Sequence, residues 1–216
     1  MNNEKEIRAF NFELKADNNE QYGDFVEGRA IVYNSVYDNG YWNEYIDEGA
    51  LDNCDMKDVR LLVNHNTDMI PLARSRNNTR NSTMQLTADS EGLKIRANLD
   101  TENNTTAKAL YSATGRGDIS GMSFMFVVDK EKWEDVDTEK PTRHILSIRR
   151  IYEVSAVTFP AYEATSFECK DALAVESAKA TLENVRAEAR AKKEAEEAKK
   201  LEKERQLQRI RILASL

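Results

Sequence analysis

The sequence has few histidines and cysteines and no long apolar run, and each scarcity excludes a class of protein. Only two histidines, His65 and His144, occur among 216 residues, so any mechanism that needs an imidazole has two candidates. The cysteines, Cys54 and Cys169, have no C-x-x-C spacing, so we expect neither a disulfide framework nor a zinc site. The lack of about 18 consecutive apolar residues argues against a membrane-spanning helix.

Positive charge is also in short supply. The chain has 31 Lys and Arg against 38 Asp and Glu, a formal net charge of −7, whereas a nucleic-acid binder usually carries a basic face. The first residues, MNNEKE, lack the basic-then-apolar pattern of a signal peptide. We therefore expect a protein without nucleic-acid or membrane partners and without a metal or cofactor. It should act in the cytoplasm or in an assembly formed there.

Hydrophobic alternation predicts a series of short strands. The helical pattern of residues 104–114 predicts one internal helix, with Asn103 or Asn104 as its N-cap. The charged residues 130–142 predict an exposed loop. Because hairpin-length connections join the strands, the expected fold is α+β, mainly β: a closed antiparallel β-barrel of about seven strands, surrounded by short helices. The strands are expected at residues 7–14, 25–33, 59–65, 69–74, 83–88, 93–99, 121–128 and 145–159.

The composition changes after Asp171, where the chain becomes rich in Ala, Glu, Lys, Arg and Leu and has no Gly or Pro. This composition predicts a long helix, of roughly 65 Å at about 1.5 Å per residue. We therefore expect a β-barrel domain at residues 1–168 and a charged helical arm at 169–216. The arm is either a solvated, partly disordered tail or a coiled-coil-like docking arm whose apolar end, 210–216, makes the contact.

Ser123 lies in the segment GDISGMSFMFVV, residues 117–128, which reads as a glycine-rich approach to a strand. Its neighbours Met122 and Phe124 would point to the opposite face of that strand. A small hydroxyl among large apolar side chains is either packed and hydrogen-bonded or used as a nucleophile. The segment alone favours the packed interpretation.

Glu153 is the most informative acidic residue. Period-two alternation places it on the same face of its strand as Ile151 and Ser155. A carboxylate on a partly apolar face is costly to bury unless it is paired. An ion pair with Arg149 or Arg150 is one interpretation, and a catalytic role is the other.

Ser123, His65 and Glu153 together supply a nucleophile, a base and an acid that could orient the base. A serine hydroxyl reacts well only when a neighbour takes its proton, which a neutral imidazole does near neutral pH. A carboxylate on the other ring nitrogen fixes the tautomer and stabilises the imidazolium. Spacing alone does not bring the three together, and a histidine at a strand end also suits a merely solvated position.

Five blocks of the sequence follow one another over residues 25–165: GRAIVYN at 28–34, EGAL at 48–51, LVNH at 62–65, SGMSFMF at 120–126 and EVSAVTFPAY at 153–162. They resemble, in the same order, the signature blocks of the tailed-phage prohead maturation proteases. That family is similar in fold to herpesvirus assemblin, a closed antiparallel β-barrel with its serine and histidine on barrel strands. The resemblance implies His65 as base, Ser123 as nucleophile and Glu153 as third member.

Several details of the resemblance stay open. Ser120 is the competing nucleophile, although Ser123 matches the serine of the glycine–hydrophobic–serine motif. Met125 stands where relatives commonly carry glycine and would narrow the space beside Ser123. The oxyanion hole is not identified: no segment matches the paired-arginine loop of assemblin, and the candidate donor is a backbone N–H near residues 160–162. His144 reads as a structural or surface residue.

The resemblance implies a serine endopeptidase of the Ser-His-Glu type. It would cleave scaffold segments of the major capsid protein, and itself, through an acyl-enzyme, acting as an oligomer inside the immature phage head assembled in the host cytoplasm. The helical arm would recruit it to scaffold helices. The alternative is a catalytically silent scaffold protein that nucleates capsid assembly. An esterase-like hydrolase is less favoured, because the sequence has no G-x-S-x-G motif.

Overall fold

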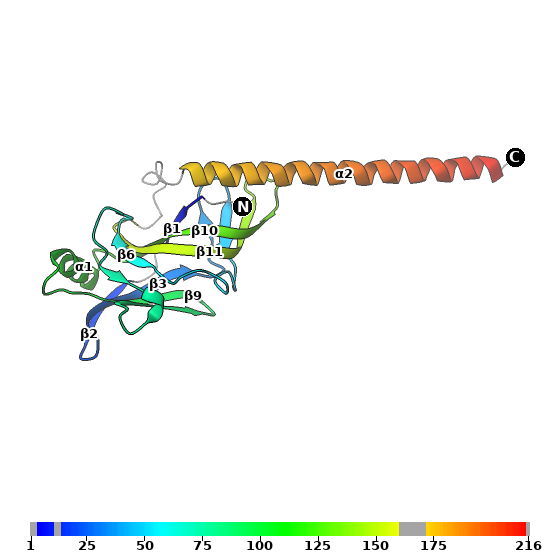
Figure 1. Cartoon of the computed structure of the whole chain (residues 1–216). Coiled ribbons are helices and arrows are strands. Elements are labelled where there is room, and N and C mark those ends of the chain that lie inside the picture. The colour runs from blue at the N-terminus through cyan, green and yellow to red at the C-terminus, as the bar shows by residue number, and fades with distance from the viewer. Residues whose placement is uncertain (1–3, 11–13, 160–171, 215–216) are drawn as a thin grey trace.

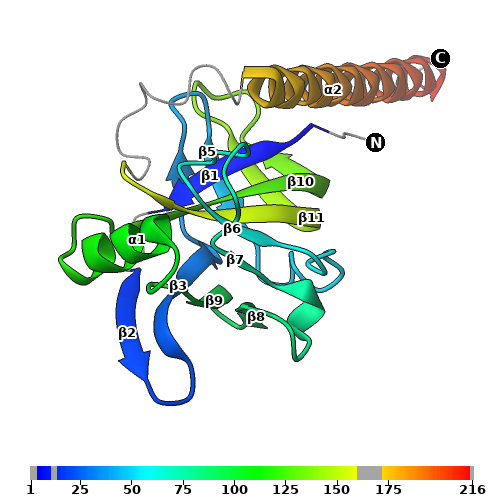
Figure 2. The ribbon, with the colours of Figure 1, turned by 60° about the vertical axis from the view of Figure 1, so that its left-hand side comes forward.

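Two β-sheets, a short helix beside them and a long helix that extends away from them make up the described part of the chain (Figures 1 and 2). This architecture comes from a computed structural model, which describes residues 4–10, 14–159 and 172–214. Within those residues, no helix is both long enough and apolar enough to cross a membrane.

The first sheet has seven strands and is built on the long antiparallel pair β10 and β11. Its main path runs β1-β10-β11-β5-β4, and β6 joins it between β11 and β7. The first residues of β11 pair with β5 and its last residues with β6, both in parallel. The strands are β1 Glu6–Phe10, β4 Tyr37–Asp38, β5 Asn43–Ile46, β6 Arg60–Val63, β7 Ala73–Arg74, β10 Gly121–Glu134 and β11 Thr142–Val157.

The second sheet has four antiparallel strands in the order β2-β3-β9-β8. The expected hairpin of β8 and β9 is confirmed, and its Gly92 is required by geometry. A Cβ there would lie 2.1 Å from the Ile31 carbonyl oxygen, at a φ of +137° that side chains rarely adopt. The strands are β2 Lys15–Asn19, β3 Gly23–Val32, β8 Met84–Asp89 and β9 Gly92–Asn98.

The main core forms where the two sheets pack against each other. Alternation supplies one apolar face from each sheet: β10 and β11 contribute residues such as Phe124 and Val154, and β3 and β9 contribute Val26 and Ile95, all fully buried. Helix α1 (Thr105–Gly115) contacts β2 and β3, and the expected cap is confirmed, since the Asn104 side chain accepts two backbone N–H groups of its first turn.

The expected closed barrel is wrong. The strands divide between two sheets, and the path of the larger sheet ends at two edge strands, β1 and β4, which a barrel would not have. The larger sheet is also mixed, because irregular segments such as residues 47–59 carry the chain back to lie parallel to β11. Alternation predicted strands but not their partners, which is why closure was misjudged.

The segment between β10 and β11 also differs from expectation. The exposed loop predicted at residues 130–142 is shorter, because β10 continues to Glu134 and β11 starts at Thr142. In addition, β11 carries an extra residue opposite Met125 and Phe126, a β-bulge that interrupts alternation. Ile151 therefore lies in the core, while Glu153 lies on the other face of the sheet and not beside Ile151 as alternation suggested.

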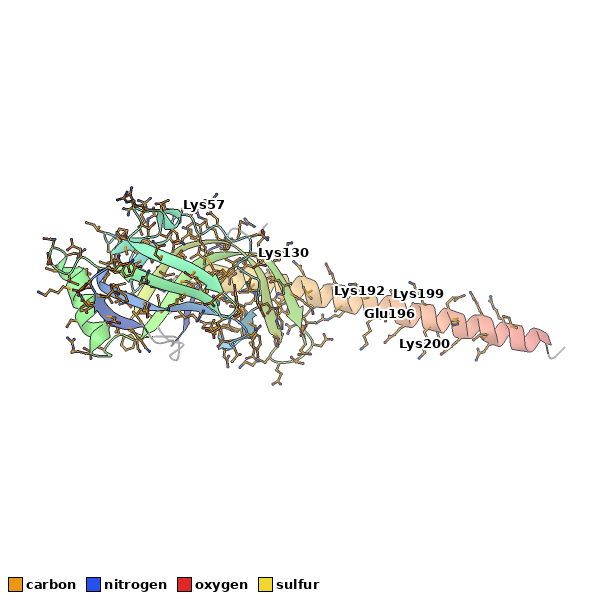
Figure 3. The ribbon with its side chains drawn as sticks, turned by 90° about the horizontal axis from the view of Figure 1, so that it is seen from below. Lys57, Lys130, Lys192, Glu196, Lys199 and Lys200 are labelled. Atoms are coloured by element: carbon orange, nitrogen blue, oxygen red, sulfur yellow. The ribbon has the colours of Figure 1, made fainter. Side chains whose placement is uncertain are left out.

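The long helix α2, Ala172–Ala214, is attached to the sheets only near its start. Ala178 and Leu182 pack on Trp42 and Trp133, whose rings meet edge to face at 5.3 Å. The side chains of residues 191–210 are all exposed, and Figure 3 shows Lys192, Glu196, Lys199 and Lys200 on the part that projects past the sheets. The domain division at residues 168 and 169 stays a prediction, and Cys169 lies outside the described residues.

Candidate active site

The turn after β6 places His65 against β11. Both Asn64 and His65 have left-handed backbones, with φ of 50° and 54°, a conformation that asparagine tolerates and histidine adopts less readily. Bonds to β11 hold this turn. The Asn64 N–H donates to the Ala156 carbonyl, the Asn64 side chain accepts the Thr158 N–H, and the His65 N–H donates to the Ser155 hydroxyl at 3.1 Å. These bonds fix the imidazole beside the last residues of β11.

His65 and Glu153 form a buried pair. The His65 Nδ1 atom lies 2.5 Å from Glu153 Oε1, and the two residues are only 6% and 3% exposed. Because an ionised carboxylate can only accept, Nδ1 carries the hydrogen and the lone pair of a neutral ring lies on Nε2. Nε2 is buried and has no hydrogen-bond partner among the described residues. The pair thus presents a free proton acceptor inside the protein.

Ser155 contacts the other side of the same carboxylate and was missed as a functional candidate by sequence reasoning. Its hydroxyl donates to Glu153 Oε2 at 2.5 Å and accepts the His65 N–H, and the residue is fully buried. The available signal was its period-two position beside Glu153. The interpretation of Glu153 as a partner of Arg149 or Arg150 is wrong, since those arginines pair with Asp129 and Asp55.

Ser123 lies directly opposite Ser155 in the antiparallel pair of β10 and β11, so both serines are on the face that carries Glu153. Ser123 is fully buried. Its hydroxyl donates to the carbonyl of Arg8 in β1 at 2.8 Å, and no hydrogen bond joins it to His65. The structure therefore brings His65 and Glu153 into contact, with Ser123 on the same face but turned toward β1.

The other residues raised by the sequence lie around this face or away from it. Ser120, the competing nucleophile, is half-buried just before β10, where its carbonyl accepts the Leu14 N–H. Met125 is two residues beyond Ser123 on the same face and opposite Glu153, so it borders the site as expected. Residues 160–162, suggested for the oxyanion hole, lie outside the described residues.

His144 is placed at the start of β11, far along the strand from Glu153. Its Nδ1 lies 2.8 Å from Asp47 Oδ1, and its ring stacks on Tyr45 at 5.4 Å between centroids. The side chain is 25% exposed. This histidine–carboxylate pair resembles that of His65 in composition but lies near the surface, in keeping with the structural or surface role expected for it.

A second buried polar cluster lies beside the site and consists of Glu6, Arg8, Glu44 and Arg143. Arg8 donates to both carboxylates, at 2.6 Å to Glu6 and 2.5 Å to Glu44, and Arg143 does so at 2.7 and 2.9 Å. Burial alone would raise the pKa of Glu44, but the two arginines outweigh it and lower that pKa to about 2. Opposite charge thus stabilises each ion of this cluster.

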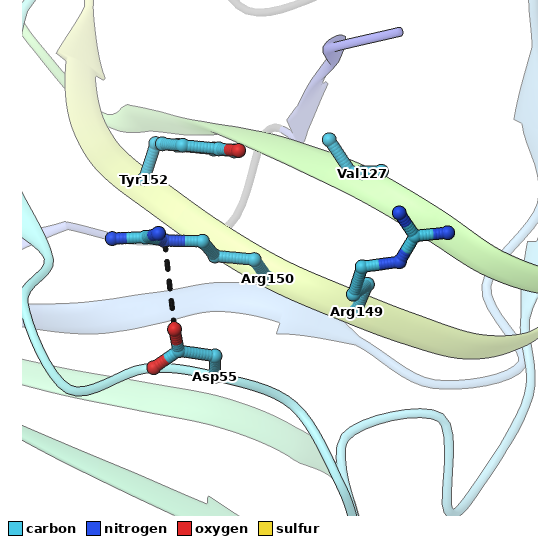
Figure 4. A pocket seen from close by; sticks show the side chains of 5 residues that line it. All are labelled: Asp55, Val127, Arg149, Arg150 and Tyr152. Carbon is cyan, nitrogen blue, oxygen red and sulfur yellow. Dashed lines mark ion pairs between the residues drawn. The ribbon is translucent and has the colours of Figure 1, made fainter. Parts of the chain in front are cut away.

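Figure 4 shows a hollow of about 300 Å³ that is lined in part by Val127, and strand alternation places Val127 on the same face as Ser123. Val127, four residues beyond Ser123 on β10, lines it, which places the hollow roughly 13 Å away at about 3.3 Å per residue. Arg150 points across it, 3.7 Å from Asp55 and over the ring of Tyr152. Its arginines make the hollow polar, and Figure 4 shows their guanidinium groups directed apart.

A buried histidine–carboxylate pair and a serine on the same face of the sheet are the side-chain types that serine hydrolases use, and comparisons with known proteins name the family. Residues 10–182 match the family described as Caudovirus prohead serine protease, and the chain belongs to that family. It is 30% identical over 154 residues to the prohead protease of Enterobacteria phage HK97. That match covers 70% of this chain and 61% of the relative, so the chain spans less than two thirds of the relative's length. No solved structure shows significant similarity.

Proposed function

We propose that this protein is a serine endopeptidase that acts in the phage prohead, with Ser123 as nucleophile, His65 as base and Glu153 as the acid that orients it. The observation that carries the proposal is His65 Nε2, a buried atom with no hydrogen-bond partner in the part of the chain that the structure describes. Arg96 Nε and Thr114 Oγ1 are also buried without a partner among the described residues, but His65 Nε2 belongs to a ring whose other nitrogen is held by a carboxylate. Such an atom is a proton acceptor kept available for a substrate step.

The first chemical step begins with a rotation of the Ser123 hydroxyl. It leaves the Arg8 carbonyl and donates to His65 Nε2, which becomes possible because Ser123 and the His65–Glu153 pair share one face of the sheet. The serine oxygen then attacks the substrate carbonyl carbon while Nε2 takes the hydroxyl proton. Glu153 stabilises the imidazolium through Nδ1–H.

The second half of the reaction returns that proton. His65 Nε2–H protonates the leaving amine, the peptide C–N bond breaks, and Ser123 is left as an ester. A water molecule then attacks the ester carbonyl while Nε2 takes its proton, the bond to the Ser123 oxygen breaks, and Nε2 returns that proton to the serine as the new carboxyl terminus leaves. The proposed substrates are scaffold segments of the major capsid protein and the protease itself, inside the immature head; family membership supports this choice.

A catalytically silent assembly protein is the second candidate. Two observations favour it: Ser123 is fully buried with its hydroxyl bonded to Arg8, and residues 191–210 of α2 form an exposed helical arm. Under this proposal the arm would contact scaffold helices and the serine would be a packed residue. The enzyme is preferred because the silent protein gives no reason for a buried histidine–carboxylate pair whose Nε2 has no partner among the described residues.

The decisive experiment is co-expression of Ser123→Ala with the cognate capsid protein, followed by mass measurement of the products. We expect the wild type to trim the capsid protein and the variant to leave it intact while folding normally, because the alanine removes only the attacking oxygen. Ser120→Ala is the matched control, since it removes the competing hydroxyl and should keep the activity. Trimming by Ser123→Ala at the wild-type rate would rule out the assignment.

Labelling with a fluorophosphonate separates the two candidates in a second way. The reagent forms a covalent bond with activated serine oxygens, so the enzyme should carry one adduct, located at Ser123 by peptide mass mapping. His65→Ala should lose the adduct because the base is gone. A silent assembly protein would give equal, minimal labelling in the wild type, His65→Ala and Ser123→Ala.

A further inference from the structure

The His65–Glu153 pair is closed into a ring of hydrogen bonds by one hydroxyl. The His65 backbone N–H donates to Ser155 Oγ at 3.1 Å, and the Ser155 hydroxyl donates to Glu153 Oε2 at 2.5 Å. The remaining carboxylate oxygen, Oε1, accepts Nδ1–H of the same histidine at 2.5 Å. The ring therefore joins the backbone of His65 to its own side chain through two residues of β11.

We propose that Ser155 is a positioning residue for the reaction, fixing both the turn that carries His65 and the carboxylate that orients its ring. This inference rests on the proposed function and extends it by one residue. The hydroxyl uses its hydrogen on the carboxylate and its lone pair on the histidine backbone, so it sets the position of the imidazole from both ends.

The carboxylate needs the second donor because it is buried. Glu153 is 3% exposed, and each of its oxygens has one described hydrogen-bond donor, Nδ1–H for Oε1 and the Ser155 hydroxyl for Oε2. Without that hydroxyl, Oε2 would face a protein interior that offers it no hydrogen, and rotation about the terminal torsion would draw Oε1 from the ring. The imidazole would lose the anion that stabilises its charged form.

The histidine backbone needs the acceptor for a different reason. Asn64 and His65 are two consecutive residues with left-handed φ, a conformation that persists only where surrounding bonds enforce it. Asn64 is held by Ala156 and Thr158, and the bond to Ser155 holds His65 itself. Removing the hydroxyl would free the His65 N–H and let the ring shift relative to Ser123.

Ser155 does not itself attack the substrate under this proposal. It is one strand away from Ser123 and directly opposite to it, so the two hydroxyls are easily confused as nucleophiles. Their hydrogens distinguish them: that of Ser155 points to an acid, and that of Ser123 to a main-chain carbonyl from which it can turn away. Ser123 remains the oxygen expected to form the adduct.

The test compares Ser155→Ala, Ser155→Thr and Ser147→Ala in the full chain. Ser147 is the matched control because it is a partly exposed serine on β11, away from the pair. The rate constant for fluorophosphonate labelling of Ser123 should fall about 10- to 100-fold in Ser155→Ala, the range expected for loss of a hydrogen bond to a charged group. Ser155→Thr should restore most of the rate because it keeps the hydroxyl, and Ser147→Ala should match the wild type.

A spectroscopic measurement separates positioning from a merely structural role. The Nδ1–H proton of His65 should give a downfield ¹H NMR signal, assigned with His144→Gln, since the chain has two histidines. We expect the signal to move upfield or broaden in Ser155→Ala and to persist in Ser155→Thr. Should Ser155→Ala fail to fold, Ser155→Cys keeps a similar volume with a weaker donor and replaces it.

The outcomes distinguish this inference from the proposed function. If Ser123→Ala and His65→Ala lose labelling while Ser155→Ala keeps the wild-type rate and Nδ1–H signal, the positioning role is wrong and the enzyme assignment stands. An adduct on Ser155 would also overturn it. If Ser123→Ala is labelled and trims capsid protein like the wild type, the proposed function itself fails.

Discussion

Two buried polar clusters lie side by side in this protein and differ in how completely they are paired. In the cluster of Glu6, Arg8, Glu44 and Arg143, each ion contacts a partner of opposite charge. In the site, by contrast, His65 Nε2 has no partner among the described residues. Ions that are all paired with one another stabilise the fold, whereas a nitrogen whose lone pair has no partner can accept a proton. This difference supports the proposal that the chemistry takes place in the incompletely paired cluster.

Arg8 connects the two clusters. Its guanidinium lies between Glu6 and Glu44, and its carbonyl accepts the Ser123 hydroxyl. The ion pairs thus fix the strand, β1, whose main chain holds the proposed nucleophile. A substitution in the paired cluster should therefore lower the stability of the fold and, through β1, disturb the position of Ser123. A substitution in the site should mainly lower activity.

The largest effect is expected from Glu153→Gln. The amide can still contact Nδ1 but is neutral and presents a donor, so it no longer favours the reactive tautomer or the imidazolium. We expect activity to fall by roughly 10³- to 10⁴-fold, measured as the rate of capsid-protein trimming or of fluorophosphonate labelling. Glu134→Gln, an exposed carboxylate paired with Lys132, is the control and should keep full activity. Equal rates in both variants would refute the distinction between the clusters.

Arg143→Met should have the next largest effect, on stability. Arg143 is fully buried, and its removal leaves Glu6 and Glu44 with half of their positive partners. Breaking such a buried pair costs about 3–5 kcal/mol, which urea unfolding would measure. Arg116→Met breaks the exposed pair with Asp118 and should cost at most about 1 kcal/mol. If the two variants unfold at the same urea concentration, the buried cluster does not hold the fold.

Acid should weaken the paired cluster through Glu44. Because the two arginines lower its folded-state pKa from 4.5 to about 2, its stabilising contribution is complete above pH 4.5 and is lost as the pH falls toward 2. The free energy of unfolding should decline by about 3 kcal/mol over that window from this group. Glu44→Gln should show a shallower decline below pH 4.5. Identical slopes in the two proteins would contradict the assignment to Glu44.

The smallest effect is expected from His144→Gln. This residue forms a histidine–carboxylate pair with Asp47 that matches His65–Glu153 in composition, but the histidine is 25% exposed. A pair open to solvent contributes about 0–1 kcal/mol, so stability and labelling of Ser123 should barely change. A loss of activity comparable with that of His65→Ala would mean that the difference in burial does not explain which of the two histidines is needed for activity.

Sequence patterns singled out polar residues that the structure buries on β10 and β11, but they did not predict how the strands pair. Polar residues at apolar strand positions, such as Glu153 and Ser123, can be recognised in the sequence because burying a polar group costs free energy unless a partner compensates it. The closed barrel was wrong because alternation reports which faces are apolar but not which strands pair. The parallel contacts of β11 with β5 and β6, and the bulge before Glu153, depend on distant segments.

The sequence did not predict the buried cluster of Glu6, Arg8, Glu44 and Arg143, for a related reason. Glu6, Arg8 and Glu44 lie in short strands where alternating charges normally indicate a solvent-exposed face. They are buried because β1, β5, β10 and β11 come together and α2 covers the adjacent tryptophans. The sequence around Ser155 did not predict its role because the hydroxyl contacts His65, which lies 90 positions away in the sequence.

The projecting part of α2 has a hydrodynamic consequence. A rod attached to a rounded body raises frictional drag far more than it raises mass, so a single 24.7 kDa chain should elute from a sizing column ahead of spherical standards of equal mass. Elution volume would then mimic a dimer. Light scattering measures molar mass independently of molecular shape, so it is the measurement by which self-association of this protein should be judged.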